Sequence, residues 1–412
     1  MVGVVKINLQ LLTKDFWIKI AICAAGYGMF SNSVVIPLVT ALGKEYPDAS
    51  LFLMNFIISG SEICALAAGL LTGILIKYVR KKHLLIWGTV TFFIAGVSGA
   101  FSPNLEFLAF TRALDAISDG ILTVTTASLI VDLWKEEQEQ GFVFGLYNML
   151  SGFFGSIASV IAGYAAVVSW RNAFYVNAIS IIAVILCILF VPDIDTKGDS
   201  RSKVENENNA GINEEVNWYP GRFVFAMITL GFLQTFCYTI EMLLDVYIAE
   251  QEIGNSIVTG YMGFISGGFG AVGNLTAAFL MVKFRRKKLF VAMCAAWFAI
   301  TFFMYANCHS VPLLVLCLAM TLIAQFWIII YFNVYTANSV PAKYRGFCIA
   351  IVTNMVYIDA FICTYIPTIA SKLFGTKTIA ETCFVIGIID VVIMVIYVIL
   401  SFVRKQKPYS YI

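Results

Sequence analysis

Three ionisable side chains within one apolar stretch are the residues best placed to do chemistry. Arg112, Asp115 and Asp119 lie in the segment 105–133 at spacings of three and seven residues, so they share one face of a helix. Arg112 can pair with Asp115 and keep that carboxylate ionised, whereas Asp119 lies one turn further along. A carboxyl group buried without a cation favours its neutral, protonated form. The pattern therefore indicates an ion pair beside a carboxyl group that can bind and release a proton.

Acidic side chains also interrupt other apolar stretches. A charge at the centre of a membrane costs about 2.5–3.5 kcal/mol or more, so such a residue normally faces a partner or a polar pathway. For Glu241 and Asp245, a role in such a pathway and a position in the solvent-filled mouth of the protein are equally consistent with the sequence. Asp390 is consistent with a structural role. The set that we assign to proton coupling is Glu62, Arg112, Asp115, Asp119 and Asp359.

Catalytic, metal and nucleotide chemistry has little support in the sequence. The chain has only two His, His83 and His309, and its ten Cys are scattered without paired spacing. This leaves no cluster of His, Cys and carboxylates for a metal ion, or for a nucleophile with its base. No Gly-x-x-x-x-Gly-Lys-Ser/Thr loop occurs, so ATP is not expected as a fuel. We expect neither an enzyme nor a bound cofactor or metal.

Membrane-spanning helices must position these groups. The composition is 60% hydrophobic and 13% charged, more apolar surface than a soluble fold of 412 residues can bury. Apolar stretches recur along the chain, each long enough to cross about 30 Å of hydrocarbon as a helix. We predict twelve spans, at 16–38, 51–77, 83–101, 105–133, 139–166, 171–192, 222–249, 255–283, 288–307, 311–338, 343–373 and 377–404.

The distribution of basic residues predicts the orientation. Lys and Arg are retained on the cytoplasmic side of a membrane. With both termini on one side, 22 of the 27 Lys and Arg fall in segments on that side, 4 fall on the other, and Arg112 lies within a helix. We therefore expect a multi-pass protein of the cell membrane with both termini in the cytoplasm. A net charge of +2 spread in this way describes orientation and not a nucleic-acid surface.

One polar segment divides the chain, and the sequence repeats on either side of it. Residues 193–221 are rich in Asn, Glu and Asp, as is typical of a linker. The strings IKYVRKK at 76–82 and VKFRRKK at 282–288 stand 206 positions apart, and each closes the second helix of its half. The sequence thus predicts an all-α integral membrane protein of two pseudo-symmetric six-helix bundles, 1–192 and 222–412.

Four short strings mark helix ends and the segment 105–133. They are GILIKYVRKK at 73–82, RALDAISDG at 112–120, SWRNAF at 169–174 and PAKYRGF at 341–347. In this order, within a duplicated twelve-helix chain, they resemble the signature sequences of the major facilitator superfamily of secondary transporters, twelve-helix bacterial type. Lys77 and Arg80 occupy places where the family signature has Asp and Gly.

The resemblance implies a solute site between the two halves, lined mainly by the first, fourth, seventh and tenth helices. An aromatic site with amides and excess acid favours a small amphipathic or cationic organic solute. The candidate solute-binding residues on these helices are Tyr27, Phe30, Asn32, Gln234, Tyr238, Glu241, Gln325, Trp327 and Tyr331.

The basic string after the second helix is a candidate gate. The resemblance places this loop against the inner ends of the fourth and eleventh helices, where Asp132 is a partner for Arg80 or Lys81. Basic residues at such a position also serve as anchors to anionic lipid headgroups. The set that we assign to gating is Gly73, Lys77, Arg80, Lys81 and Asp132.

The interpretation of these patterns is a proton-coupled secondary active transporter that works by alternating access. Its expected partners are a small-molecule substrate, protons and the lipid bilayer, and it is expected to act as a monomer. A uniporter or solute exchanger, whose acids bind solute instead of protons, is an alternative. A membrane sensor that transports nothing would share the same helices.

Overall fold

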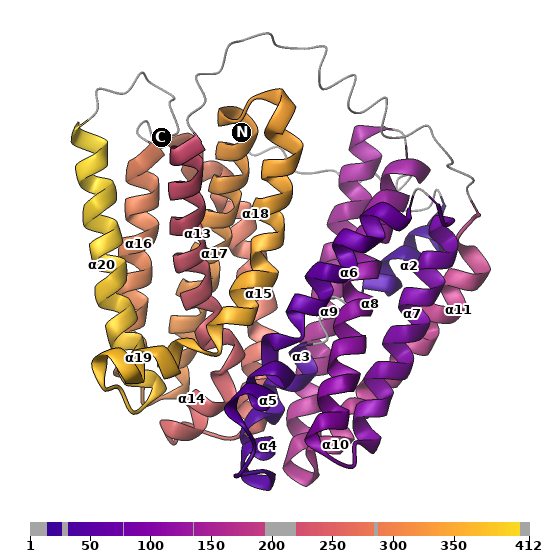
Figure 1. Cartoon of the computed structure of the whole chain (residues 1–412), viewed down its shortest axis with the longest axis horizontal. Coiled ribbons are helices and arrows are strands. Elements are labelled where there is room, and N and C mark those ends of the chain that lie inside the picture. The colour runs from indigo at the N-terminus through magenta and orange to yellow at the C-terminus, as the bar shows by residue number, and fades with distance from the viewer. Residues whose placement is uncertain are drawn as a thin grey trace.

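The computed structural model describes residues 15–26, 32–76, 78–134, 136–193, 220–283 and 287–403. These residues form helices joined by short turns, without a strand among them (Figure 1). Tyr27, Phe30 and Lys77 lie outside the described residues, so their assigned roles stay predictions.

Residues before the linker form one bundle of six spans. The first span runs through α2 (Phe16–Ala25), α3 (Asn32–Val35), η2 (Ile36–Leu38) and α4 (Val39–Glu45), and the second through α5 (Leu51–Asn55), η3 (Phe56–Gly60) and α6 (Glu62–Leu75). The other four are α7 (Lys81–Ser98) with η4 (Gly99–Phe101), α8 (Leu105–Leu133), α9 (Glu137–Val168), and α10 (Trp170–Ala173) with η5 (Phe174–Ile179) and α11 (Ser180–Phe190).

Residues after the linker form the second bundle. Its spans are α13 (Pro220–Met242) with α14 (Leu244–Glu250), α15 (Ser256–Lys283), α16 (Lys287–Tyr305), α17 (Val311–Ser339), α18 (Ala342–Cys363) with α19 (Ile366–Phe374), and α20 (Ile379–Val403). Each bundle has its own apolar core. The core of the N-terminal bundle contains residues of that half only, and the core of the C-terminal bundle includes just Val39 and Ile58 from the other half among its buried residues.

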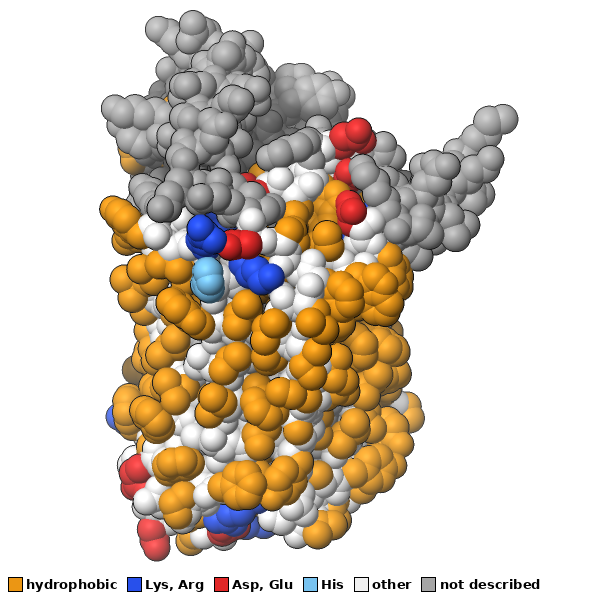
Figure 2. Space-filling model, turned by 90° about the vertical axis from the view of Figure 1, so that its right-hand side faces the viewer, with side chains coloured by type: hydrophobic (Ala, Val, Ile, Leu, Met, Phe, Trp, Pro, Cys, Tyr) orange, Lys and Arg blue, Asp and Glu red, His pale blue; other side chains and the backbone are white. Residues whose placement is uncertain are grey.

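The predicted all-helical membrane fold is confirmed. Within the described residues, eight helices are individually long and apolar enough to span a membrane, and α5–η3 with α6 makes a ninth as a pair bent by 47°. The other expected spans correspond to α2–α4, α15 and α18. On the face that Figure 2 shows, hydrophobic side chains cover the middle and charged side chains lie toward the two ends. This is the surface that a helix bundle needs in order to sit in hydrocarbon.

The two bundles touch mainly through α9 against α15 and α6 against α18. Small residues allow backbones to approach closely along the first pair: a Cβ on Gly163 would lie 2.4 Å from the Ser256 carbonyl oxygen, and one on Gly260 would lie 2.7 Å from the Ser159 carbonyl oxygen. We call the end where α11 ends and α13 begins the linker end, and the opposite end the distal end. The bundles diverge toward the linker end and meet at the distal end (Figure 1).

Candidate functional site

Irregular backbone marks the spans that line the interface between the bundles. In the second span, the π-helical turn η3 precedes the 47° bend, and π-helical turns are frequent at functional sites. The first span changes its winding at η2, and the seventh breaks at Leu243. Pro37 in η2 and Leu243 stand 206 positions apart, the offset of the sequence repeat. Both halves therefore interrupt their first helix at the same level.

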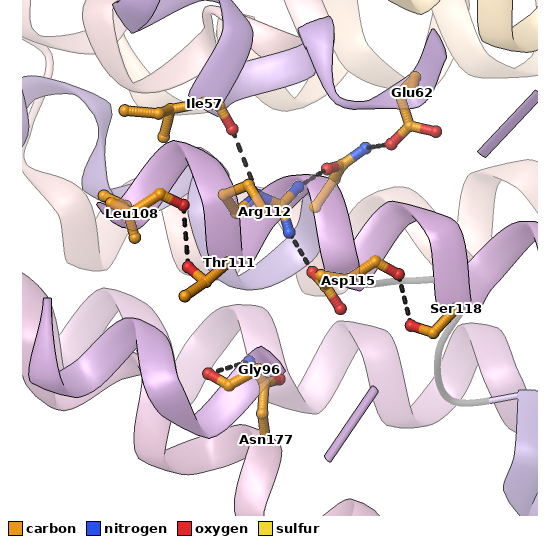
Figure 3. Close-up of polar contacts among 10 residues, drawn as sticks. Ile57, Glu62, Gly96, Leu108, Thr111, Arg112, Asp115, Ser118 and Asn177 are labelled. Carbon is orange, nitrogen blue, oxygen red and sulfur yellow. Dashed lines mark hydrogen bonds and ion pairs between the residues drawn. The ribbon is translucent and has the colours of Figure 1, made fainter. Parts of the chain in front are cut away.

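Arg112 is the centre of a buried polar network in the N-terminal bundle. Its guanidinium forms an ion pair with Asp115, the pair expected from their spacing, and donates to the side-chain oxygen of Asn32. Its Nε also donates to the carbonyl oxygen of Ile57, at 3.2 Å, in the π-helical turn (Figure 3). The side-chain amide of Asn32 in turn donates to Glu62. Asn32 thus links the guanidinium to a second carboxylate across three spans.

Asp119 lies two turns beyond Arg112 on α8 and is also buried. It accepts a hydrogen bond from Thr123 at 3.3 Å, and it interacts electrostatically with Glu62. No cation among the described residues forms an ion pair with Asp119 or Glu62. Tyr357, on α18 of the other bundle, interacts with Thr123, Asp119 and Glu62. These two carboxyl groups therefore lie at the interface and within reach of both halves.

A second group of polar side chains faces the interface from the C-terminal bundle. Asp359 on α18 accepts a hydrogen bond from Thr235 at 2.9 Å, and Glu241 on α13 interacts with Gln325 on α17. Tyr238 interacts electrostatically with Glu241, Asp359 and Glu62, so its ring lies between the acids of the two halves.

Two buried oxygens of this group lack a hydrogen-bond partner within the described part of the chain. They are Oδ2 of Asp359 and Oε1 of Gln234. A buried acceptor without a partner costs about 1–3 kcal/mol. These atoms therefore provide binding capacity for a ligand that carries hydrogen-bond donors.

Two predicted solute-binding residues point elsewhere. The indole nitrogen of Trp327 donates to the Thr276 hydroxyl at 2.8 Å, and its ring packs against Trp297. Tyr331 is fully buried and stacks on Phe290 of α16. Because both side chains pack inside the C-terminal bundle, we leave them out of the proposed site.

The basic string near the linker end makes contacts within the N-terminal bundle. Lys81 forms a buried ion pair with Asp132, one of the two contacts expected from the sequence. Arg80 instead pairs with Asp193, and both side chains are exposed. A Cβ on Gly73 would meet no neighbour within 4 Å. These contacts join the start of α7 to α8 and to the segment that follows α11, all within one half, and the gating role stays a prediction.

The distal end carries a cross-bundle contact that the sequence left open. Asp245 is buried in this conformation, and its role as a mouth residue stays a prediction. Its carboxylate accepts from the backbone N–H of Thr40 at 2.8 Å and from the Thr259 hydroxyl at 2.7 Å. No sequence signal identifies this contact, because the donor from the N-terminal bundle is a backbone group.

Two further hydrogen bonds join the bundles. Ser59 lies 3.2 Å from Thr364 between hydroxyl oxygens, and Tyr164 lies 2.8 Å from Tyr261 between phenol oxygens. Of these three hydrogen bonds between the bundles, only the one at Asp245 includes a carboxyl group. The described interface is thus closed by small residues and hydrogen bonds on its distal side.

Two six-helix bundles with acidic and aromatic side chains at their interface define a membrane protein with the architecture of secondary transporters. Residues 18–358 match the family model described as the Major Facilitator Superfamily, and the chain belongs to this family.

Sequence relatives match only part of their own length. The chain is 23% identical over 162 residues to the methylenomycin A resistance protein of Streptomyces coelicolor, covering 39% of this chain and 34% of that protein. It is 28% identical over 136 residues to the galactose-proton symporter of Escherichia coli, covering 32% of this chain and 28% of that protein. The matched part thus spans about a third or less of these relatives.

Solved structures agree with the fold over nearly the whole chain. The inward-open xylose transporter XylE of E. coli superposes with a TM-score of 0.70 at 17% identity, covering 96% of this chain and 98% of that one. The nucleoside transporter NupG gives a TM-score of 0.70 at 14% identity, covering 93% and 100%. These likenesses establish the fold.

Proposed function

We propose that the chain is a proton-coupled secondary transporter that moves a small amphipathic or cationic organic solute by alternating access. The observation that carries this proposal is the buried network of Arg112, Asn32 and Glu62, with Asp119 beside it at the interface. It combines an ion pair with two carboxyl groups that form no ion pair of their own within the described residues. Such groups can exchange a proton where a strong ion pair cannot.

The N-terminal bundle is the proposed proton side. The positive charge of Arg112 compensates the negative charge of Asp115, so the carboxylate stays ionised and holds the guanidinium in place. Glu62 accepts a hydrogen bond from Asn32, which favours the ionised form, whereas its burial favours the neutral form. A change in what Asn32 contacts would therefore change how readily Glu62 holds a proton.

The C-terminal bundle is the proposed solute side. Tyr238 of α13 interacts with Glu241 and with Asp359 of α18, and Glu241 interacts with the amide of Gln325 on α17. Gln234 lies one turn before Tyr238 on α13. Carboxylates near an aromatic ring favour a positively charged or amphipathic organic molecule. Because Asn32 and Tyr238 occupy equivalent positions 206 residues apart, the two sides meet at one level of the interface.

Alternating access requires the contacts at the distal end to break and re-form. In the orientation predicted from Lys and Arg, the distal end faces outward, so this conformation opens toward the cytoplasm. Outward opening would have to separate Asp245 from the Thr40 N–H.

Purified protein in liposomes that contain a pH-sensitive dye tests the proposal. The first panel should hold amphipathic amines, as the proposed site favours, and neutral sugars such as xylose and galactose, because the galactose-proton symporter and XylE are named for these sugars. Substrate-driven proton movement supports the proposal. Solute flux without protons would favour the uniporter or exchanger, and binding without flux would favour the sensor.

A further inference from the structure

Three cysteines meet at the distal end of the C-terminal bundle, away from the proposed site. Cys308 lies in the loop between α16 and α17, Cys317 lies in the second turn of α17, and Cys383 lies near the start of α20. All three are fully buried. The thiols of Cys308 and Cys317 hydrogen-bond to each other, and Cys308 also donates to the Ser310 carbonyl oxygen at 3.6 Å.

We propose that Cys308 and Cys317 form a reversible disulfide on the extracytoplasmic side of the membrane. Their thiols are already in contact, so forming the bond requires only a small approach of the two sulfur atoms, to about 2.05 Å. The loop can supply this movement, because Asn307, His309 and Ser310 around Cys308 are exposed. The predicted orientation places this end outside the cytoplasm, where disulfides persist.

The local chemistry makes Cys308 the attacking thiol. The hydrogen bond from Cys317 lowers the pKa of Cys308, with smaller contributions from Ser310, Tyr247 and His309. A lower pKa raises the fraction of Cys308 that is thiolate, and the thiolate is the nucleophile. Cys317 lies deeper in the helix and takes the role of the resolving thiol.

The bond forms by exchange with the disulfide of an extracytoplasmic thiol–disulfide oxidoreductase. Opening of the exposed loop brings Cys308 to the surface, where its thiolate attacks one sulfur of that disulfide. A mixed disulfide forms as the other sulfur leaves as a thiolate. Cys317 gives its proton to this thiolate and attacks Cys308 Sγ, which releases the second sulfur of the oxidoreductase. Two thiols of this chain are oxidised, and one disulfide of the oxidoreductase is reduced to a dithiol.

The pair lies beside the distal closure. The hydroxyl of Tyr247, on α14, donates to the Tyr305 carbonyl oxygen at 2.6 Å, and Tyr247 also interacts with Cys308. Asp245, which contacts the other bundle, lies two residues earlier on α14. The disulfide would therefore fasten the loop against which α14 packs.

The test uses the full chain in intact cells and in membranes. Free thiols are blocked with N-ethylmaleimide, the protein is digested without reductant, and peptides joined by a disulfide are identified by mass spectrometry. We expect a linked peptide that contains Cys308 and Cys317 after exposure to an impermeant oxidant or to an oxidised oxidoreductase. It should disappear in Cys308→Ser and in Cys317→Ser and persist in Cys383→Ser, the matched control.

Three results would overturn the proposal. The first is that both thiols remain open to alkylation, after unfolding, in oxidant-treated protein. The second is a linked peptide that joins Cys308 to Cys383 instead. The third is linkage only with a membrane-permeant oxidant, which would place the pair on the cytoplasmic side. A lower unfolding temperature on reduction in the parent, but not in Cys308→Ser, would confirm that the bond forms in the folded protein.

Discussion

Replacing Arg112 with Ala should strongly destabilise the N-terminal bundle. The Arg112 and Asp115 side chains are only 2% and 3% exposed, so the substitution leaves a buried carboxylate without its ion-pair partner. Removing one partner of a buried ion pair costs about 3–5 kcal/mol. The Ile57 carbonyl and the Asn32 side-chain oxygen also lose their donors, which adds about 1–3 kcal/mol for an acceptor left unsatisfied.

The measurement is a thermal unfolding curve with a maleimide fluorophore, which reacts as cysteines become exposed. The chain suits this assay because nine of its ten cysteines are buried. Since 1 kcal/mol shifts the midpoint of a unit of 150–250 residues by about 2–4 °C, Arg112→Ala should lower it by roughly 10 °C or more. Adding Asp115→Ala should recover part of this loss, because no uncompensated charge then remains.

Arg80→Ala is the matched control. The Arg80–Asp193 pair has side chains 48% and 36% exposed, and exposed pairs contribute about 0–1 kcal/mol. The reasoning is refuted if Arg112→Ala loses no more stability than Arg80→Ala. It is equally refuted if the double variant is less stable than Arg112→Ala alone.

The remaining predictions concern coupling, the distal closure and orientation. Asp119→Asn and Glu62→Gln should each abolish proton-driven accumulation of the solute and keep counterflow exchange, because an amide resembles the protonated acid. If both variants still accumulate solute with a proton gradient as the only driving force, these residues are not the proton carriers. Asp245→Ala removes the acceptor of the Thr40 N–H. Because a hydrogen bond to a charged group contributes about 1.5–3 kcal/mol, its loss should raise the fraction of molecules that are open at the distal end roughly tenfold or more. Spin labels at Asp48 and Glu252 would report that opening as a longer distance between the labels. Tyr164→Phe removes only an exposed contact, so it should change this distance less than Asp245→Ala does. Equal effects of the two substitutions would argue against a special role for Asp245. An impermeant maleimide added outside intact cells should not label a cysteine introduced within 193–221, and labelling there would reverse the orientation.

The sequence by itself determined the helices and the contacts local to them. The stretch 105–133 corresponds residue for residue to α8, because apolar length and the polar turn before Leu105 specify a span without help from neighbours. The Arg112–Asp115 pair also follows from spacing alone, since residues three apart on a helix are adjacent. Local periodicity was less informative for the first span, which was expected to end at 38 but continues as helix to Glu45.

Only the tertiary structure decided which groups of different helices meet. Asn32 and Glu62 are 30 residues apart, and Thr40 and Asp245 are 205 apart, so both contacts depend on the tilt and rotation of separate helices. Trp327 and Tyr331 also depend on the tertiary structure. Their helix is apolar over most of its surface, so its sequence pattern does not say which way these two rings face. A helix with lipid on one side and protein on the other is apolar toward both, and packing alone chooses its rotation.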